Sequence, residues 1–223
     1  MIYILLDDSP QEILTLKGET FKYLVKVRRH SVGDKIDFRS KDDMSILHTY
    51  EISSIDGRCV ELLHVESRES IVSASKSLHV GWCIIDMKSI EKVLPSLCEI
   101  GVEKISFITC KRSQKNFKLD LKRFERILEA SMQQCGRSTY IEFSTCKNIE
   151  EFITLHPQTK VFDFTEKTLD EYGDIETVLV GCEGGFSQDE RELLKEKDVF
   201  RLDTPMVLRS ESAVVAVASK IIL

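Results

Sequence analysis

VLVGCEGGFSQDE, residues Val178 to Glu190, joins a run of apolar residues to a polar segment through a glycine-rich loop. Residues 178–180 are β-branched or aliphatic, which predicts a buried strand. Ser187 and Glu190 have the S-x-x-E spacing of a capping box, so a helix should begin directly after Ser187. Ligands bind α/β proteins at such loops, where a strand ends and a helix follows. The segment therefore predicts an α/β fold with a ligand site in this loop.

The glycine loop GCEGG, residues 181–185, is unlike two common phosphate-binding loops. It has no lysine, as a Walker loop would, and it lacks the spacing G-x-G-x-x-G of a dinucleotide fold. Glu183 would repel a phosphate but suits a ligand with hydroxyl donors or a positive charge, such as S-adenosylmethionine. The glycines would let the backbone approach that ligand closely. The alternative is a tight strand–helix connection with a solvated Glu183.

A second segment, LDTPMVLRSESAVVAVASKI from Leu202 to Ile221, repeats the order of strand, turn and apolar helix. Ser210 or Ser212 can cap this helix. Arg209 and Glu211 lie at its start, where Arg209 can equally serve as a structural ion-pair partner. If both turns lie at the same edge of the sheet, they form two walls of one pocket.

The region from Leu78 to the C-terminus alternates between strand and helix patterns, which implies a mostly parallel sheet. Gly101 lies where a helix C-terminus favours glycine, and Pro95 should kink or shorten the helix before it. Trp82 and Phe107 are interpreted as core residues of strands rather than as base-stacking residues. The expected strands cover residues 78–85, 102–109, 160–164, 177–181 and 199–203, and the expected helices cover residues 90–100, 121–135 and 213–222.

Residues 1–72 read instead as short strands, with DKIDFRS and CVELLHVES as examples and VGDK and IDGR as turns. A short helix is expected around residues 18–29. A small β-barrel is the natural prediction for such a region. The serine-rich segment at residues 67–76 is a plausible domain boundary.

The composition limits the class of protein. No run of about 18 apolar residues appears, so no membrane span is expected, and the apolar N-terminus predicts a first strand rather than a signal peptide. The seven cysteines are an odd number without a C-x-x-C pair. This pattern favours free thiols in a cytoplasmic protein over a zinc site or a disulfide framework.

The net charge of −6 hides two basic zones. Seven Lys and Arg residues lie between Phe21 and Lys41, and nine lie between Lys104 and Arg137. These zones fit a nucleic-acid phosphate footprint, and they fit solvated helix faces equally well.

Five segments in register resemble a known family. VGCEGGFSQDE and LRSESA resemble the signatures GPEGGfs..E and LR.ETA of the bacterial 16S ribosomal RNA uridine-N3 methyltransferases, the RsmE family of the SPOUT superfamily. CEIGVEKISFITCKRSQ, QQCGRS and FKYLVKVRRHSVGDKI resemble further segments of that family in the same order. The similarity covers nearly the whole chain.

This resemblance implies a PUA-like, RNA-binding β-barrel over residues 1–72 and a SPOUT α/β methyltransferase domain with a deep trefoil knot over residues 73–223. It implies S-adenosylmethionine as cofactor and 3-methyluridine in 16S ribosomal RNA, within the small ribosomal subunit, as product. It further implies a homodimer, formed through the SPOUT domain, with no membrane or metal partner.

The site residues expected on this basis fall into three groups. Arg209 is the candidate that stabilises charge on the uracil oxygens, and Glu183 and Glu211 are alternatives for ligand orientation or proton acceptance. The cofactor pocket is expected to contain Val180, Gly181, Glu183, Gly184, Gly185, Leu202, Val207, Leu208, Ser210 and Ser212. The expected RNA contacts are Lys22, Arg28, Arg29, Lys111, Arg112 and Arg137.

The chain departs from the family pattern at a few positions. Cys182 stands in place of a usual Pro, and Thr204 and Met206 stand where Gly and Arg are common. Two alternatives remain at this point: a SPOUT enzyme with another target, such as a tRNA ribose, and a non-catalytic RNA-binding module.

Overall fold

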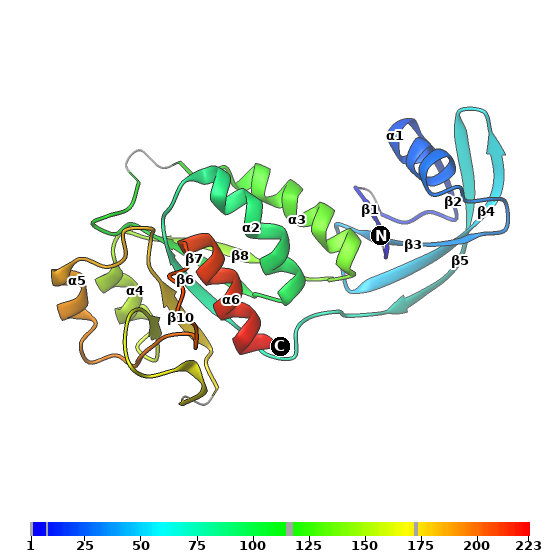
Figure 1. Cartoon of the computed structure of the whole chain (residues 1–223). Helices are drawn as coiled ribbons and strands as arrows, with labels where there is room; N and C mark the ends of the chain where they lie inside the picture. The colour runs from blue at the N-terminus through cyan, green and yellow to red at the C-terminus, as the bar shows by residue number, and fades with distance from the viewer. Residues whose placement is uncertain (1, 8, 115–117, 172–173) are drawn as a thin grey trace. The chain divides into compact units, whose positions relative to one another are not determined.

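The chain folds into two units, each with its own sheet (Figure 1). This computed structural model describes residues 2–7, 9–114, 118–171 and 174–223. The N-terminal unit contains residues up to Ser73 together with Met132–Thr139, and the C-terminal unit contains Ala74–Ser131 and Tyr140–Leu223.

The N-terminal unit is built on a curled, half-barrel sheet with strand order β1-β3-β4-β5-β2. All neighbours are antiparallel except β1 and β3, which are parallel. The IDGR turn joins β4 to β5 as predicted, because Asp56 pairs with Cys59 across it. The strands are β1 Ile4–Leu6, β2 Ile13–Lys17, β3 Lys35–Ser40, β4 Ile46–Asp56 and β5 Cys59–Glu69.

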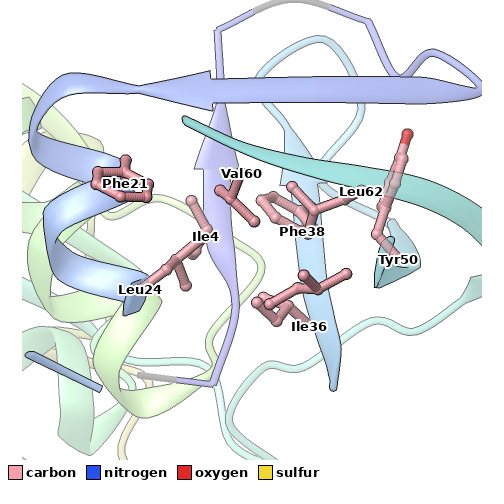
Figure 2. Packing of buried hydrophobic residues seen from close by; sticks show 9 residues of the cluster. Ile4, Phe21, Leu24, Ile36, Phe38, Tyr50, Val60 and Leu62 are labelled. Atoms are coloured by element: carbon pink, nitrogen blue, oxygen red, sulfur yellow. The ribbon is translucent and has the colours of Figure 1, made fainter. Parts of the chain in front are cut away.

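A short helical segment packs on this sheet, as the sequence predicts. It consists of α1, Gly18–Phe21, continued by the π-helix η1, Lys22–Val27. Figure 2 shows Phe21 and Leu24 from this segment close to Ile4 of β1. Burial of such apolar side chains is the main stabilising contribution in a small unit of this kind.

The C-terminal unit contains a six-stranded sheet with order β11-β9-β10-β6-β7-β8, parallel throughout. This confirms the predicted parallel α/β architecture; the trefoil knot stays a prediction. Strand β8 was not predicted, because its sequence EFSTC has little apolar character. The strands are β6 His79–Cys83, β7 Lys104–Ile108, β8 Glu142–Cys146, β9 Lys160–Phe162, β10 Thr177–Val180 and β11 Val199–Phe200.

The helices of this unit follow the strands in alternation. No helix in the described part of the chain is long and apolar enough to cross a bilayer. The helices are α2 Met87–Ile100, α3 Leu121–Cys135, α4 Ile149–Leu155, α5 Gln188–Leu193 and α6 Ser210–Ile222, with a 3-10 turn η2 at Leu169–Glu171.

Helix α2 continues through Pro95, so proline does not shorten it, and the alternative of a kink stays a prediction. Its buried stripe, Ile90, Leu94 and Leu97, outweighs the one backbone hydrogen bond that proline removes. The carbonyl of Pro95 accepts a hydrogen bond from Ser131 Oγ of α3 at 3.1 Å. The helix ends at Gly101 in the left-handed conformation, as predicted.

Side chains alternate between the two faces of the sheet. Trp82 of β6 reaches α6, and the ring of Phe107 of β7 packs at a tilt against that of Phe124 of α3. Gly81 faces Phe152 of α4 on the other side. Trp82 and Phe107 are fully buried, which confirms that both are core residues.

Candidate active site

A cavity of about 410 Å³ lies at the carboxyl end of the parallel sheet. The segments that follow β9, β10 and β11 line it, so the two predicted turns do meet in one pocket. Its size is within the range of small-molecule sites. Of the ten residues expected in a cofactor pocket, nine line this cavity: Val180, Gly181, Glu183, Gly184, Gly185, Leu202, Val207, Leu208 and Ser210.

Three predicted residues at the start of α6 are not on the cavity wall, as far as the described residues define it: Arg209, Glu211 and Ser212. A helix turns about 100° per residue, so only positions three or four apart share a face. Ser210 and Ala213 face the cavity for this reason. Arg209 and Ser212 are exposed, and Glu211 is half-buried.

Ser210 does not cap α6, so that prediction was wrong. The N-cap residue is Arg209, and no side chain caps the helix. The Ser210 hydroxyl instead donates to the carbonyl of Gly181 at 2.5 Å and accepts from Trp82 Nε1 at 2.9 Å. One buried hydroxyl thus joins the glycine loop, strand β6 and helix α6.

The predicted capping box is present at the start of α5. Ser187 N donates to Glu190 Oε2 at 2.7 Å, and Glu190 N donates to Ser187 Oγ at 3.3 Å. Glu190 is only 6% exposed, and its other oxygen accepts from Lys111 N at 2.7 Å. This carboxylate therefore also ties the turn after β7 to the glycine loop.

Arg112, predicted to contact RNA, is exposed and binds the glycine loop; its contact with RNA stays a prediction. Its guanidinium donates to the carbonyl oxygens of Gly184 and, at 3.3 Å, Phe186. A Cβ at Gly184 would come within 3.1 Å of the Arg112 side chain, so a larger residue there would require Arg112 to shift slightly. Gly185 has φ +62°, which also favours glycine.

The other predicted RNA contacts differ in exposure. Lys22, Arg28 and Arg29 are exposed on the N-terminal unit, and Lys111 is exposed beside its ion-pair partner Asp189. A hydrogen bond from Lys22 to Glu19 raises the pKa of this lysine.

Arg137, predicted on the catalytic domain, falls within the N-terminal unit and is 6% exposed. Its Nε donates to the carbonyl of Thr139 at 2.6 Å. Such burial argues against a phosphate contact, because the guanidinium already bonds within its own unit.

Sequence reasoning missed several charged and aromatic residues of the cavity. Arg191 forms a forked ion pair with Asp163, with distances of 2.8 and 3.1 Å, and this contact raises the pKa of Arg191. Phe164 lines the cavity although it is 73% exposed, and Arg201 adds a third arginine to Arg112 and Arg191. Asp163 and Phe164 directly follow β9, the neighbour of β10, so the strand-end rule could have found them.

Three cysteines lie together beside the glycine loop. Cys110 and Cys182 have their sulfur atoms 3.4 Å apart, and Cys83 adjoins Cys110. All seven cysteines are thiols in this structure. Among the described residues, no cluster of three His, Cys, Asp or Glu side chains is arranged to hold a metal ion.

Comparison with known proteins assigns the family. Residues 73–222 match the family model described as an RNA methyltransferase domain. The chain is 39% identical over 215 residues to a ribosomal RNA small subunit methyltransferase E from Helicobacter pylori, and the match covers 95% of both proteins. The chain belongs to the ribosomal RNA small subunit methyltransferase E family. A Borreliella burgdorferi member of the family is 25% identical and covers 91% of this chain.

Solved structures show that the fold is that of the same methyltransferase E family. A ribosomal RNA small subunit methyltransferase E from Neisseria gonorrhoeae, bound to S-adenosyl methionine, has a TM-score of 0.77 at 17% identity, over 99% of this chain and 96% of that one. A Legionella pneumophila protein in complex with the cofactor SAM has a TM-score of 0.76 at 22% identity, over 99% of this chain and 96% of that one.

Proposed function

We propose that this chain methylates N3 of a uridine in 16S ribosomal RNA, with S-adenosylmethionine as the methyl donor. The main support is the cavity within the RNA methyltransferase domain, which the glycine loop and the turn at residues 202–208 enclose. The family membership supports the ribosomal RNA target, and the N-terminal sheet and the CKRS and QQCGR segments support the uridine-N3 specificity.

The cavity fits S-adenosylmethionine in size and chemistry. Phe162, Leu202 and Leu208 offer an apolar surface for an adenine ring, and the backbone of the glycine loop is accessible for hydrogen bonds. Glu183 supplies a carboxylate for ribose hydroxyls or an ammonium group, whereas both oxygens of the Asp163 carboxylate accept from Arg191. When bound, the cofactor supplies a methyl group on a positively charged sulfonium.

The residues at the start of α6 act on the substrate base in this proposal. The N3–H of uracil must lose its proton, and negative charge then develops on the uracil oxygens. Arg209, exposed beside the cavity wall, stabilises that charge, and Glu183 or Glu211 accepts the proton or orients the base. The methyl group of the cofactor and N3 of the uracil must be held in line for the transfer, and the cavity provides this positioning.

Arg209→Ala tests this assignment. We expect turnover to fall about 100-fold or more, since removal of one preorganised donor has effects of that order. The dissociation constant of S-adenosylmethionine, measured by calorimetry, should change less than about twofold, because Arg209 is not on the cavity wall. Equal losses in turnover and cofactor affinity would contradict the role of Arg209.

The N-terminal unit, residues 1–72 in this proposal, holds RNA through Lys22, Arg28 and Arg29, and Lys111 contributes from the methyltransferase domain, residues 73–223. Each phosphate contact that is lost should flatten the salt dependence of RNA affinity by about 0.7 to 0.9 in the log–log slope. Arg28→Ala should show this change, whereas Arg58→Ala, an exposed arginine of the β4–β5 turn, should not.

We further propose that two copies of the chain form a homodimer in the cytoplasm, in line with the family resemblance and the cysteine pattern. Light scattering coupled to gel filtration measures the assembly state. A monomer at micromolar concentration would reject this part of the proposal.

The deciding experiment maps modified nucleotides in 16S ribosomal RNA by mass spectrometry. Ribosomal RNA from cells that lack this protein should carry one unmethylated uridine in place of 3-methyluridine, and the purified protein should restore it. Restoration of a ribose methyl group in tRNA would favour the alternative SPOUT target. Absence of S-adenosylmethionine binding in calorimetry would favour a non-catalytic RNA-binding module.

A further inference from the structure

Neighbouring strand ends bring two thiols into contact. Strands β10, β6 and β7 lie side by side in the sheet and run parallel, so their carboxyl ends meet at one edge (Figure 1). Cys83 is the last residue of β6, Cys110 follows β7 and Cys182 follows β10. The loops after β7 and β10 meet across β6, where Cys110 Sγ lies 3.4 Å from Cys182 Sγ.

The surroundings distinguish the two thiols. Hydrogen bonds with the thiols of Cys182 and Cys83 lower the pKa of Cys110, and Ser113 Oγ lies 3.1 Å from the same sulfur. The hydrogen bond with Cys110, together with burial, raises the pKa of Cys182. A thiolate is the reactive form of cysteine, and the contact of 3.4 Å places the second thiol within reach of the sulfur that reacts first.

Cys182 is part of the cavity wall, between Gly181 and Glu183. Its carbonyl accepts a hydrogen bond from Gly185 N at 2.9 Å, which closes the turn of the glycine loop. The family signature has Pro at this position, which cannot form a disulfide. A small oxidant that enters the cavity meets the wall that Cys182 helps to form, and the Cys182 sulfur touches that of Cys110.

We propose that Cys110 and Cys182 are an oxidisable pair whose disulfide weakens cofactor binding. Hydrogen peroxide is the oxidant. One of the two sulfur atoms attacks one peroxide oxygen, the O–O bond breaks, and a sulfenic acid and one water form. The other thiol then attacks the sulfenic sulfur and a second water leaves, so two thiols and one peroxide give one disulfide and two waters.

The disulfide would shift the cavity wall. An S–S bond is about 2.05 Å long, so the sulfur atoms must approach by about 1.3 Å. Ser210 holds the Gly181 carbonyl and Arg112 holds the Gly184 carbonyl on either side of Cys182. The approach of Cys182 therefore distorts the loop between two fixed points. Displacements of about 1 Å in a positioned site have large effects on its ligand.

The test uses the full chain, first reduced and then treated with hydrogen peroxide. Peptide mass spectrometry without reduction should find a peptide linked through Cys110 and Cys182, lighter by two hydrogen atoms. Calorimetry should show a dissociation constant for S-adenosylmethionine at least about tenfold higher than that of the reduced protein. Dithiothreitol should reverse both changes.

Two variants serve as controls. Cys110→Ser should bind the cofactor as the reduced protein does and should be insensitive to peroxide. Cys59→Ser, which alters a half-buried thiol of the N-terminal unit, should remain sensitive.

Alkylation of both thiols after peroxide treatment would overturn the proposal, and so would a linked peptide with unchanged cofactor affinity. The effect on affinity rests on the proposed function, and the reduced protein tests that function separately. If the reduced chain does not bind S-adenosylmethionine, the proposed function and the claim about affinity both fail. The mass spectrum of the linked peptide still tests whether the disulfide forms.

Discussion

Residues 181–186 and the turn at residues 202–208 both contribute to the cavity wall, yet the chain holds them differently. The glycine loop, residues 181–185, is bound by Ser210 and Arg112, and the Ser187–Glu190 capping box fixes the residues that follow it. The leucine turn, residues 202–208, has mainly local contacts: Thr204 N donates to Leu202 O at 2.9 Å, and Met206 N donates to Thr204 Oγ1 at 3.2 Å. Met206 and Val207 are 66% and 77% exposed.

This difference separates two contributions to ligand binding. The glycine loop is preorganised, because its contacts are formed before any ligand arrives, so it loses little entropy on binding. The exposed side chains of the leucine turn must be immobilised by the ligand, which offsets part of the binding free energy. Substitutions under the glycine loop should therefore reduce folding stability, whereas substitutions in the leucine turn should reduce affinity alone.

Glu190→Ala should give the largest effect. It removes the buried acceptor of the Ser187 and Lys111 backbone N–H groups, and unpaired buried donors should lower the free energy of unfolding by about 3 kcal/mol. Urea denaturation measures the change through the midpoint. Glu192→Ala alters an exposed residue of the same helix and should cost less than about 0.5 kcal/mol. Similar losses for both variants would mean that the glycine loop is not anchored by Glu190.

Ser210→Ala should lower the free energy of unfolding by about 2 kcal/mol. It leaves Trp82 Nε1 and the Gly181 carbonyl without their shared partner. Ser212→Ala, two residues further on and exposed, is the matched control and should be nearly neutral. The affinity for S-adenosylmethionine should fall in Ser210→Ala and stay unchanged in Ser212→Ala. An unchanged denaturation midpoint for Ser210→Ala would show that the Ser210 hydroxyl does not stabilise the glycine loop.

Mild acid should destabilise the C-terminal unit through a histidine that lies at the end of the sheet opposite the cavity. Burial, with smaller contributions from His156 and Lys104, lowers the pKa of His79, at the start of β6, to about 4 from 6.5. The unfolded chain therefore binds a proton first, and stability is lost as pH falls from about 6.5 toward 4. Between pH 7 and pH 5 the loss should be about 1–2 kcal/mol, measured by urea denaturation.

His79→Gln should flatten this pH dependence. Because the start of β6 lies at the opposite end of the strand from the cavity, the cofactor affinity of the folded protein should change little over the same window. A loss of affinity that follows the loss of stability would contradict this separation.

Val207→Ala should give the smallest effect. The side chain is 77% exposed, so the free energy of unfolding should change by less than about 0.5 kcal/mol. The dissociation constant of S-adenosylmethionine should rise about threefold, because the ligand loses a small apolar contact. Val32→Ala, which is exposed on the N-terminal unit, should change neither quantity. A destabilised Val207→Ala would show that the leucine turn is also preorganised.

Local sequence patterns predicted much of the fold. The spacing of Ser187 and Glu190 located the start of α5, and Gly101 located the end of α2, because caps depend on residues within one turn. The parallel sheet followed from the alternation of apolar runs. Strand β8 escaped prediction because EFSTC has weak apolar patterning and obtains its place by pairing with β7.

Side-chain roles that depend on distant partners were harder to predict. The sequence predicted Arg112 as an RNA contact and gave no sign that it also binds carbonyl groups 72 and 74 residues away. Arg137 lay in a basic zone, but the structure buries it. Asp163 and Arg191 are 28 residues apart, and no local pattern links them.

The sequence alone determined most of the strands and helices of the C-terminal unit and where several of them end, and it offered two turns that form one pocket if they share an edge of the sheet. These features depend on hydrophobic periodicity and on hydrogen bonds between near neighbours. Only the tertiary structure decided that Ser210 joins Trp82 across 128 residues, and that two cysteine sulfur atoms touch beside the cavity. Such contacts depend on strand order and on the direction of each side chain, which are set when the whole sheet is packed.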